Sequence, residues 1–475
     1  MTDAITVDIC IIGAGSAGLS VAAGAARMGA RTVLIEAGRM GGDCLNTGCV
    51  PSKSLLAAAK AMQAIRAARR FGADGLEPRI DFAAVSRRVH DVIETIAPHD
   101  SVERFTRLGC KVIQAHGRFI DPGAVEAGGQ LVRARRFVVA TGSRAAAPAI
   151  PGLGGVPYFT NETLFDNIVL PNHLVVIGAG PVGCEMAQAH RRLGARVTLL
   201  DLGPMLPKDD PEAVAVVRKS FATEGIAAFE GVTILRVERS QGGIVVALRE
   251  GDGERLIEGS HLLIAAGRRP NVENLGLDAA GVRFGPKGIE VDARLRSSNK
   301  RIFAAGDVAG SYQFTHLAGY HAAIVLKNAL FRLPAKADTR ALPWVTFTDP
   351  ELAQVGLTEA QARERHGDRF RVLRSDFADN DRAQAEGVVE GFLKAMVTRR
   401  GHVLGATIVG PHAGELIQSW VLAVGLGLKI GALAGMIAPY PTLGEISKRA
   451  AGCFYAPTLF SPRMRRLVRV LGMFG

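Results

Sequence analysis

The sequence has no long uninterrupted apolar run and no cysteine and histidine pairs at metal-binding spacing. Its most apolar stretch, residues 421–438, is interrupted by Lys429 and by glycines, which predicts buried helices at a core or subunit interface rather than a membrane span. The 11 histidines show no ligand spacing, so we expect no resident metal. No secretory leader precedes the first strand-like run, and the six cysteines form no disulfide framework, which predicts a cytoplasmic protein.

Acidic residues are in the minority, with 45 Asp and Glu against 57 Lys and Arg and a formal net charge of +12. The basic residues are spread along the chain without interleaved aromatic residues or a recognisable nucleic-acid-binding module. We therefore expect no nucleic-acid partner, and attraction of small anionic ligands is the simpler explanation of the charge.

The chain is long and rich in glycine. Its 475 residues, 48% of them hydrophobic, exceed one ordinary core and predict several domains. The 56 glycines show no collagen-like period, and many fall in short turns between apolar runs. This pattern is typical of a nucleotide-binding α/β chain.

Two segments repeat one pattern of strand, glycine turn, helix, strand and acid. The run Val7 to Ile12 precedes GAGSAG and ends at Glu36, and the run from Leu174 precedes GAGPVG and ends at Asp201. In both copies the acid lies 23 positions after the first glycine. Such glycines permit a tight turn, close approach of a pyrophosphate and close helix packing. The sequence therefore predicts two dinucleotide-binding units, with turn glycines Gly13, Gly15, Gly18, Gly178, Gly180 and Gly183.

Later segments suggest where the domains meet. Residues 136–152 and 262–277 each contain a strand followed by a glycine, as expected where the chain leaves one nucleotide domain for the next. Composition changes near residue 341. We predict a first nucleotide-binding domain over 1–150, a second over 151–272, a central segment over 273–340 that returns to the first, and a final domain over 341–475.

The segment GGDCLNTGCVPSKSLL, residues 41–56, contains Cys44 and Cys49, followed by a helical stretch that carries Lys53. The spacing lets the two sulfurs meet, and a helix N-terminus stabilises a thiolate. Two structural cysteines and half a zinc site are the alternatives, but a partner metal pair is absent and a passive disulfide would be reduced in the cytoplasm. We predict a redox-active pair. The apolar surroundings of three other cysteines predict core packing for Cys10, Cys110 and Cys184.

With these motifs in this order, the whole chain resembles the class I pyridine nucleotide-disulfide oxidoreductases. That family includes dihydrolipoamide dehydrogenase, glutathione reductase and mercuric reductase. The resemblance implies an α/β fold of two Rossmann-like dinucleotide-binding domains, the first for FAD and the second for NAD(P)H, plus a C-terminal α+β dimerisation domain. It also implies a homodimeric enzyme that passes electrons from NADH through FAD to the Cys44–Cys49 disulfide and then to a small-molecule substrate.

The resemblance also assigns the cofactor-binding residues. It places the pyrophosphate of FAD at the first glycine turn and its ribose at Glu36. The further FAD positions are Gly42, Lys53, Gly117, Thr141, Gly142 and Asp307. The pyridine nucleotide falls at the second turn, near Gly267, with Asp201 at the ribose. A carboxylate there accepts from a 2′-OH and repels a 2′-phosphate, so NADH is favoured over NADPH.

The catalytic roles follow from the same resemblance. Cys49 is expected to face the flavin and form a charge-transfer complex, and Cys44 to be the interchange thiol that attacks the substrate. Lys53 and Glu185 match an ion pair near flavin N5. His316 is expected to be a structural neighbour of the flavin.

The chain departs from two members of the family at Tyr440. Dihydrolipoamide dehydrogenase and glutathione reductase have there a proton-shuttling histidine from the partner subunit, with a glutamate five residues later. Here Tyr440 takes that place and Glu445 is kept. A phenol titrates near pH 10, so it is a poor base at neutral pH. The predicted substrate is therefore a small thiol or disulfide or a related molecule. A mercuric reductase-like metal or electrophile reductase and dihydrolipoamide dehydrogenase itself are the alternatives.

Mercuric reductase also has a tyrosine at this position. That enzyme carries a vicinal cysteine pair near its C-terminus and an N-terminal metal-capture domain, neither of which is present in this sequence. Only Cys453 lies near the end of the chain, and we expect it to be a buried small hydrophobe rather than a reactive thiol.

The final residues, SPRMRRLVRVLGMFG, place four arginines among apolar residues. Such a segment could contact an anionic membrane surface weakly, remain a solvated tail, or cover the partner subunit. A non-enzymatic alternative follows from the first possibility: a membrane-docked redox sensor that binds both cofactors.

Overall fold

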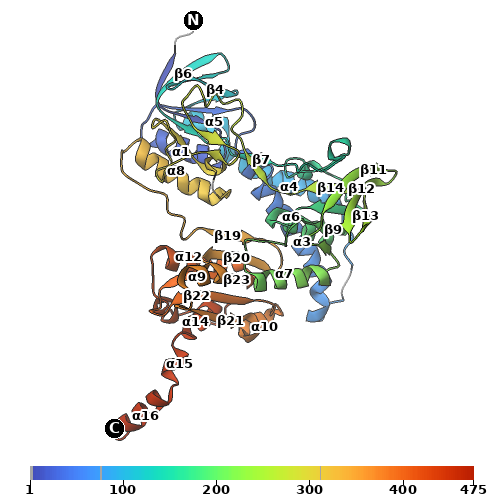
Figure 1. The fold of residues 1–475 in the computed structure, drawn as a ribbon, viewed down its shortest axis with the longest axis vertical. Coiled ribbons are helices and arrows are strands. Elements are labelled where there is room, and N and C mark those ends of the chain that lie inside the picture. The colour runs from blue at the N-terminus through green and yellow to red at the C-terminus, as the bar shows by residue number, and fades with distance from the viewer. Residues whose placement is uncertain (1–3, 75–76, 311, 475) are drawn as a thin grey trace. The chain divides into compact units, whose positions relative to one another are not determined.

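The computed structural model describes residues 4–74, 77–310 and 312–474, which divide into two compact units (Figure 1). Unit 1 comprises Met1–Leu202 and Gly231–Asp338, and unit 2 comprises Gly203–Glu230 and Thr339–Gly475. Both units combine helices and strands, as predicted. The finer division into four domains stays a prediction.

The first sheet of unit 1 is built around β1 (Ile5–Ile12), the strand that precedes the first glycine turn. Its strand order is β3-β2-β1-β6-β5-β4, and β18 also pairs with β6. The strands β3, β2, β1, β6 and β18 are parallel, whereas β5 and β4 add an antiparallel extension. The other strands are β2 (Thr32–Glu36), β3 (Cys110–Gln114), β4 (Gly117–Asp121), β5 (Ala124–Ala127), β6 (Gln130–Val139) and β18 (Ile302–Ala304).

Both faces of β1 are buried, which explains its continuous apolar run. Ile9 and Ile11 belong to a core cluster that includes residues of α1 (Ser16–Arg27) and α8 (Thr315–Ala329). Cys10 and Ile12 belong to the cluster on the opposite face. Because successive side chains of a strand point to opposite faces, a strand covered on both sides needs apolar residues at every position.

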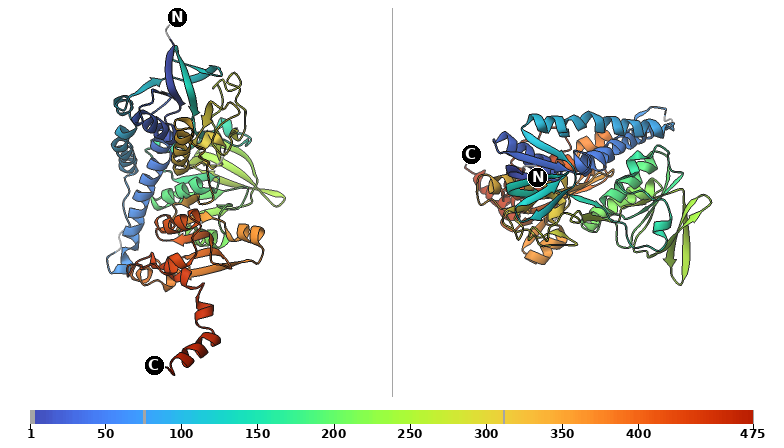
Figure 2. Two further views of the ribbon diagram at one scale, coloured as in Figure 1. Left: turned by 90° about the vertical axis from the view of Figure 1, so that its left-hand side faces the viewer. Right: turned by 90° about the horizontal axis from the view of Figure 1, so that it is seen from above.

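The second glycine motif has the same local architecture. β8 (His173–Ile177) precedes it and α6 (Pro181–Arg192) follows it. β8 lies between β9 (Arg196–Leu200) and β14 (His261–Ile264), and all three strands are parallel. An antiparallel ribbon projects beside them in Figure 2, formed by β11 (Ile234–Ser240), β12 (Gly243–Glu250) and β13 (Gly253–Gly259).

The remaining elements of unit 1 are helices on the cysteine segment and short connecting pieces. The cysteine segment forms α2 (Gly42–Asn46) and α3 (Cys49–Ala67), so Cys49 is the first residue of a long helix. The other elements are α4 (Phe82–Ile96), α5 (Val102–Arg107), β7 (Ser143–Ala145), β15 (Arg268–Pro270), β16 (Phe284–Gly285), β17 (Gly288–Ile289) and the 3-10 helices η1 (Ala68–Phe71), η2 (Ala97–Asp100), η3 (Leu153–Gly155), η4 (Leu164–Asp166) and η5 (Gly306–Ala309).

Unit 2 is built on an antiparallel sheet with strand order β19-β20-β23-β22-β21. Its core packs sheet residues against helices of the same unit and includes the fully buried Trp420. The strands of this sheet are β19 (Pro343–Thr346), β20 (Glu351–Gly356), β21 (Phe370–Asp376), β22 (Phe392–Thr398) and β23 (Val403–Gly410). The residues of β10 (Ala227–Phe229) also fall in unit 2, but β10 is not a strand of this sheet. The helices are α7 (Pro211–Thr223), α9 (Glu359–His366), η6 (Phe377–Asp379), α10 (Asp381–Glu386), α11 (Ala413–Leu416), α12 (Gln418–Gly425), α13 (Gly431–Ala434), α14 (Glu445–Gly452), α15 (Ala456–Leu459) and α16 (Pro462–Leu471).

The apolar stretch 421–438 lies on α12, α13 and the loops beside them. In the part of the chain that the structure describes, no helix has the length and apolar character needed to cross a membrane. Ala423, Ile430 and Leu433 are buried, as predicted, but Leu422 and Leu426 are exposed and Ile437 is 94% exposed. This segment therefore presents an apolar outer face as well as a buried one.

Candidate active site

In the first glycine turn, an added Cβ atom would fit at one glycine and would clash with the backbone at the other two. A Cβ atom at Gly13 would lie 2.3 Å from the carbonyl oxygen of Ala140, and one at Gly18 would lie 1.8 Å from that of Gly13. At Gly15 the nearest described atom would be Cα of Gly42, at 3.9 Å. Gly13 and Gly18 are thus required by packing, whereas the outer side of Gly15 is open.

The open side of Gly15 lies at the N-terminus of α1. Gly15 is the N-cap residue, and no described side chain caps this end of the helix. A helix N-terminus presents free N–H groups and a positive dipole, which is a suitable site for a phosphate group. The turn is therefore suited to the pyrophosphate of a dinucleotide, and its assignment to FAD stays a prediction.

Glu36 closes the first motif at the end of β2. Its carboxylate accepts hydrogen bonds from the backbone N–H of Ala14 at 2.5 Å and from that of Gly38 at 2.7 Å. These bonds fix the acid beside the glycine turn. A carboxylate has further acceptor positions that can bind a ribose hydroxyl.

The second glycine turn repeats this geometry. A Cβ at Gly178 would lie 2.4 Å from the carbonyl oxygen of Ala265, and one at Gly183 would lie 1.8 Å from that of Gly178. No described atom lies within 4 Å of the corresponding point at Gly180. Asp201 accepts from the backbone N–H of Ala179 at 2.5 Å, just as Glu36 accepts from Ala14. The two sequence repeats are therefore also structural repeats.

The two cysteines lie where two helices begin. Cys49 opens α3, and its Sγ lies 3.3 Å from Oγ1 of Thr315, the first residue of α8. Cys44, on α2, lies close enough to Cys49 and to Ser16, the first residue of α1, for both to affect the pKa of its thiol. Both cysteines are free thiols. The pair thus lies beside the first glycine turn.

The surroundings of the two thiols differ in a way that separates their pKa values. The hydrogen bond from Cys44, with that from Thr315 and the positive charge of Lys53, lowers the pKa of Cys49 to about 6. Donating that bond, together with burial, raises the pKa of Cys44 well above its usual range. At neutral pH the reduced pair therefore holds one thiolate, at Cys49, and one thiol, at Cys44.

Lys53 lies one helical turn after Cys49 and forms an ion pair with Glu185 of α6, with Nζ 2.7 Å from Oε2. The Glu185 side chain is only 5% exposed. A buried carboxylate is stabilised by a nearby cation, so this pair fixes the side of α3 that carries Cys49 against the helix of the second glycine turn. The structure thus brings together two residues 132 positions apart in the sequence.

An arginine that the sequence analysis did not single out connects the cysteine helix to Asp307. Arg268 lies 3.1 Å from the Asp43 carboxylate, and its Nε donates to Ser143 Oγ at 2.8 Å. Ser143 in turn donates to Asp307 at 2.6 Å. Burial raises the pKa of Asp307. Arg268 directly follows Gly267 in GRRPN, which was the only sequence signal.

The other predicted cofactor residues have local reasons for their identity. Gly42 packs on the first turn, because a Cβ there would lie 2.7 Å from Cα of Gly15. Gly117 is buried on β4, against Ile35 and Ile12 side chains. Gly142, at φ +68, and Gly267, at φ +126, have backbone conformations that favour glycine. The Thr141 hydroxyl donates to the backbone carbonyl of Asn271 at 2.7 Å.

Tyr440 and Glu445 lie in unit 2, whereas the cysteines lie in unit 1. Tyr440 is 70% exposed, and its hydroxyl donates to Oδ2 of Asp381 at 3.0 Å. That hydrogen bond raises the pKa of Tyr440. Asp381 lies 59 positions away in the sequence, so no local pattern pointed to it. The phenol is therefore held as a neutral donor and is even less suited to act as a base.

The cysteines outside the pair give one confirmation and one correction. Cys10, Cys110 and Cys184 are buried, as predicted. The prediction of a buried Cys453 is wrong for this chain, because its side chain is exposed. Cys453 is the C-cap of α14 and lies beyond the buried residues of that helix, where its thiol points to the Arg374 carbonyl at 3.6 Å.

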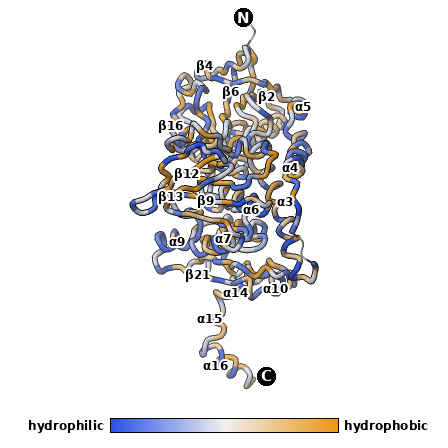
Figure 3. Tube along the Cα trace, turned by 90° about the vertical axis from the view of Figure 1, so that its right-hand side faces the viewer, coloured by the Kyte–Doolittle hydropathy of each residue, from blue (hydrophilic) through white to orange (hydrophobic). Residues whose placement is uncertain are grey.

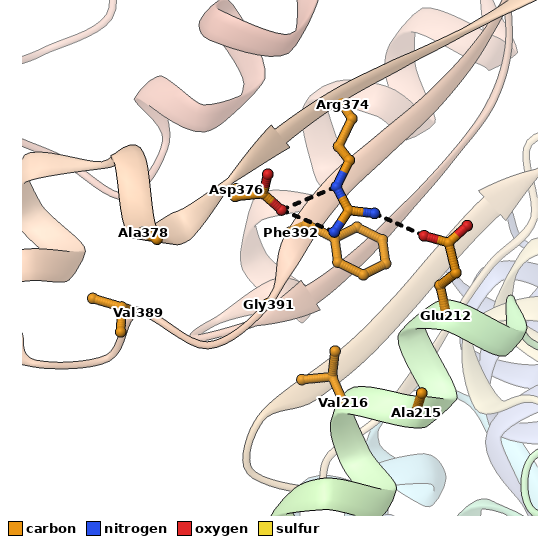
Figure 4. A pocket seen from close by; sticks show the side chains of 9 residues that line it. All are labelled: Glu212, Ala215, Val216, Arg374, Asp376, Ala378, Val389, Gly391 and Phe392. Atoms are coloured by element: carbon orange, nitrogen blue, oxygen red, sulfur yellow. Dashed lines mark hydrogen bonds and ion pairs between the residues drawn. The ribbon is translucent and has the colours of Figure 1, made fainter.

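One hollow of about 460 Å³ lies within unit 2 and contains none of the predicted site residues (Figure 4). Arg374 crosses it, but its guanidinium is already bound to Asp376 and Glu212. A neutralised arginine does not favour an anionic ligand, so this hollow gives no second cofactor site. The lining residues are Glu212, Ala215, Val216, Arg374, Asp376, Ala378, Val389, Gly391 and Phe392.

Two dinucleotide turns and an adjacent thiol pair define a redox enzyme that couples two nucleotide cofactors to a dithiol. Residues 7–322 match the family model described as pyridine nucleotide-disulphide oxidoreductase, and residues 342–451 match the dimerisation domain of the same family. The chain belongs to this family. It is thus an FAD-dependent oxidoreductase that also uses a nicotinamide cofactor, and its dimerisation domain supports a homodimer.

Relatives of different named activity are similar to nearly the whole chain. A mercuric reductase of Streptomyces lividans is 37% identical over 455 residues, covering 94% of this chain and 96% of the relative. A dihydrolipoyl dehydrogenase of Thermus scotoductus is 35% identical over 460 residues, covering 94% and 97%. The Cu(II) complex of the HOCl-induced flavoprotein disulfide reductase RclA from Escherichia coli has a TM-score of 0.83 at 26% identity, covering 93% and 98%.

Proposed function

We propose that this enzyme passes electrons from NADH, through FAD, to the Cys44–Cys49 pair and then to a small thiol-reactive substrate. A metal ion or another electrophile is favoured over lipoamide or glutathione. The observation that carries the proposal is the thiol pair between the N-termini of α1, α3 and α8, with one thiolate and one thiol at neutral pH.

Bound FAD would supply the relay that converts the hydride of NADH into an electron pair for the disulfide. Gly15 and the N-terminus of α1 would hold its pyrophosphate, and Glu36 its ribose. Lys53, held by Glu185, keeps a positive charge one turn from Cys49, which stabilises the thiolate. Thr315 orients that sulfur by its hydroxyl.

For a disulfide substrate, the reduced pair completes a two-electron exchange. The Cys44 sulfur, once deprotonated, attacks one substrate sulfur, and the other leaves as a thiolate that takes up a proton. The Cys49 thiolate then attacks Cys44, which re-forms the protein disulfide and releases the second substrate thiolate. The substrate gains two electrons from the pair; one of its two protons is the one that Cys44 lost, and the second comes from solvent.

Tyr440 supports the preference for a metal or electrophile. Deprotonation of Cys44 needs a base, because the pKa of this thiol is raised, and a neutral phenol bound to Asp381 is a poor one. Soft metal ions bind sulfur ligands directly and displace their protons. The names of two relatives agree with this chemistry, since one is a mercuric reductase and the other was solved as a Cu(II) complex.

The choice of NADH rests on Asp201. Its carboxylate ends β9 of the second motif and is followed by Leu202, Gly203 and Pro204, which offer no cation for a 2′-phosphate. Repulsion between the carboxylate and that phosphate disfavours NADPH.

A homodimer in which Tyr440 and Glu445 complete the partner's site is part of the proposal. Both residues lie in the segment that matches the dimerisation domain. The exposed apolar side chains Leu422, Leu426 and Ile437 give that segment a surface suited to a second copy.

The test is anaerobic NADH oxidation by the purified holoenzyme with Hg(II), Cu(II), oxidised glutathione or lipoamide as the acceptor. We expect turnover with a metal ion to exceed turnover with either disulfide by at least about tenfold in kcat/KM, a difference of about 1.4 kcal/mol. Cys44→Ser and Cys49→Ser serve as controls and should abolish it. Fast lipoamide turnover would instead identify a dihydrolipoamide dehydrogenase.

A further inference from the structure

The last helix of unit 2 has no packing partner within the chain. α16 (Pro462–Leu471) contains no buried residue among those described, and the match to the dimerisation domain ends at residue 451. Figure 1 shows α15 and α16 extending beyond the sheet of unit 2. The family model of the dimerisation domain therefore does not extend to this segment.

No described residue of α16 is buried, and its own residues favour its start. The Ser461 side chain accepts a hydrogen bond from the backbone N–H of Met464 at 3.3 Å, and Pro462 occupies the first helical turn. Both features favour a helix start. The segment is thus encoded as a helix rather than as an unstructured tail.

Apolar and basic residues occupy different sides of α16. Met464, Leu467, Val468 and Leu471 follow the i, i+3, i+4, i+7 spacing of one helical face. The arginines occupy the other side. Figure 3 shows hydrophilic and hydrophobic positions alternating along this helix. The four arginines are Arg463, Arg465, Arg466 and Arg469.

Exposed apolar residues continue on both sides of the helix. Phe460 is 69% exposed before it, and Phe474 is 84% exposed after it. Leu459 and Met473 are exposed as well. An apolar face of this extent on a free helix is unfavourable in water, which indicates that a surface covers it.

The charge of the segment indicates what kind of surface covers its apolar face. No acidic residue occurs between residues 446 and 475, and the chain as a whole carries a net charge of +12. Two copies of this arginine-rich helix would repel each other, and binding to a nucleic acid would leave the apolar face exposed. A bilayer with anionic headgroups matches both sides of the helix, since it offers negative charge above an apolar interior.

We propose that α16 lies in the interface of an anionic lipid membrane, with Leu467, Val468 and Leu471 toward the acyl chains and the arginines at the headgroups. The enzyme would thereby be a peripheral membrane protein. One short helix binds weakly, and each arginine near the surface raises the partition onto anionic lipid by about fivefold. Binding is therefore reversible and decreases as salt is raised.

Vesicle flotation of the FAD-loaded full chain tests the proposal. We expect the protein to float with phosphatidylcholine vesicles that contain phosphatidylglycerol and to remain below with pure phosphatidylcholine. Leu467→Ser with Leu471→Ser removes the apolar face, and Val470→Ser, on the arginine side, is its matched control. Arg465→Gln with Arg466→Gln lowers the charge, and Arg249→Gln with Arg400→Gln makes the same change at exposed positions elsewhere.

We expect the partition of the protein onto the anionic vesicles to fall at least tenfold in the Leu467→Ser, Leu471→Ser variant and in the Arg465→Gln, Arg466→Gln variant. Both control variants should float like the parent chain. Equal flotation of all five proteins would overturn the proposal. A shift of the α16 variants from dimer to monomer in light scattering would also overturn it, because the helix would then contact a second copy. A gel shift of duplex DNA without flotation would overturn it as well, because the helix would then bind nucleic acid. NADH oxidation by the variants in solution should stay unchanged, which separates this outcome from a failure of the proposed function.

Discussion

The two thiols of the reactive pair are distinguished by neighbours that come from three different helices. Cys49 receives a hydrogen bond from Cys44 and another from Thr315, and Lys53 adds a positive charge. The hydrogen bond that Cys44 donates to Cys49, together with burial, raises the pKa of the Cys44 thiol. The order of the two pKa values supports Cys49 as the thiolate that faces the flavin and Cys44 as the thiol that meets the substrate.

Thr315→Val should raise the pKa of Cys49, because it removes a hydroxyl donor and leaves the side-chain shape unchanged. In the parent enzyme the thiolate is expected above about pH 6 and is lost as the pH falls through that value. In the variant the loss should occur roughly one pH unit higher. The measurement is the far-ultraviolet thiolate absorbance of the reduced protein minus that of its Cys49→Ser variant. Thr315→Ser, which keeps the donor, should titrate like the parent; an unchanged curve for Thr315→Val would exclude a role for the hydroxyl.

Asp201→Arg should shift the enzyme toward NADPH, because it replaces a charge that repels the 2′-phosphate with one that attracts it. We expect the ratio of kcat/KM for NADPH to that for NADH to rise by at least about tenfold, or about 1.4 kcal/mol. Asp201→Asn separates charge from structure, since its amide oxygen can still accept from the Ala179 N–H. Steady-state rates with both nucleotides decide the question, and equal ratios in all three proteins would show that position 201 does not contact the 2′ group.

The sequence predicted the site residues that lie in compact motifs. It missed the residues that contact these motifs from distant positions in the sequence. Cys44, Cys49 and Lys53 lie within ten positions, so their proximity follows from local helix geometry. Thr315 and Arg268 reach the same segment from α8 and β15, and only tertiary structure brings them there. Cys453 was misjudged because burial at a helix end depends on what covers it.

The glycine turns show how one element serves both folding and binding. Within each turn the first and third glycines face backbone atoms, and the middle glycine faces open space. Sequence reasoning predicted both turns from their flanking strands and acids. It could not show which glycine is required for packing within the protein and which is required for binding of the ligand.

Alanine substitutions should separate the glycines required for folding from those required for cofactor binding. Gly13→Ala places a methyl 2.3 Å from the Ala140 carbonyl oxygen at φ +104, so we expect little folded protein. Gly15→Ala should fold as an apoprotein with a free energy of unfolding within about 1 kcal/mol of the parent, yet bind FAD poorly. Urea unfolding and flavin content check the two effects. Folded, fully flavinylated Gly15→Ala enzyme would remove this turn from the FAD site.

Gly180→Ala extends the same logic to the second turn. No described atom would contact the added methyl, so the fold and the FAD content should be preserved. The KM for NADH should rise by about tenfold or more, because the backbone can no longer approach the pyrophosphate. An unchanged KM would place the nicotinamide cofactor elsewhere.

At the scale of the whole molecule, unit 2 contains a segment from the middle of the chain. Residues 203–230 cluster with residues 339–475, and a buried ion cluster explains why. The Lys394 ammonium lies 2.9 Å from Asp210, 2.8 Å from Glu212 and 3.1 Å from Glu359. A buried lysine needs such carboxylates, but linear order gives no sign of them.

The proposed homodimer predicts complementation between two inactive enzymes. If Tyr440 acts in the partner's site, then a mixed dimer of Cys44→Ser and Tyr440→Phe chains contains one site in which both residues are native. Random re-association of equal amounts should restore about a quarter of the parent activity, provided that each variant alone is impaired. Activity equal to the mean of the two variants would show that Tyr440 does not complete a partner's site.

The place of β18 in the first sheet has a consequence for how the chain is made. This strand pairs with β6 beside the first glycine motif, and Asp307, which follows it, binds Ser143. The ribosome releases the first glycine turn long before residues 302–307 exist, and chains fold from the N-terminus as they emerge. If Asp307 binds FAD as predicted, FAD is captured late in synthesis, and nascent chains arrested before residue 302 should not retain flavin. Until FAD is bound, we expect the thiol pair to be more accessible to oxidants than it is in the loaded enzyme.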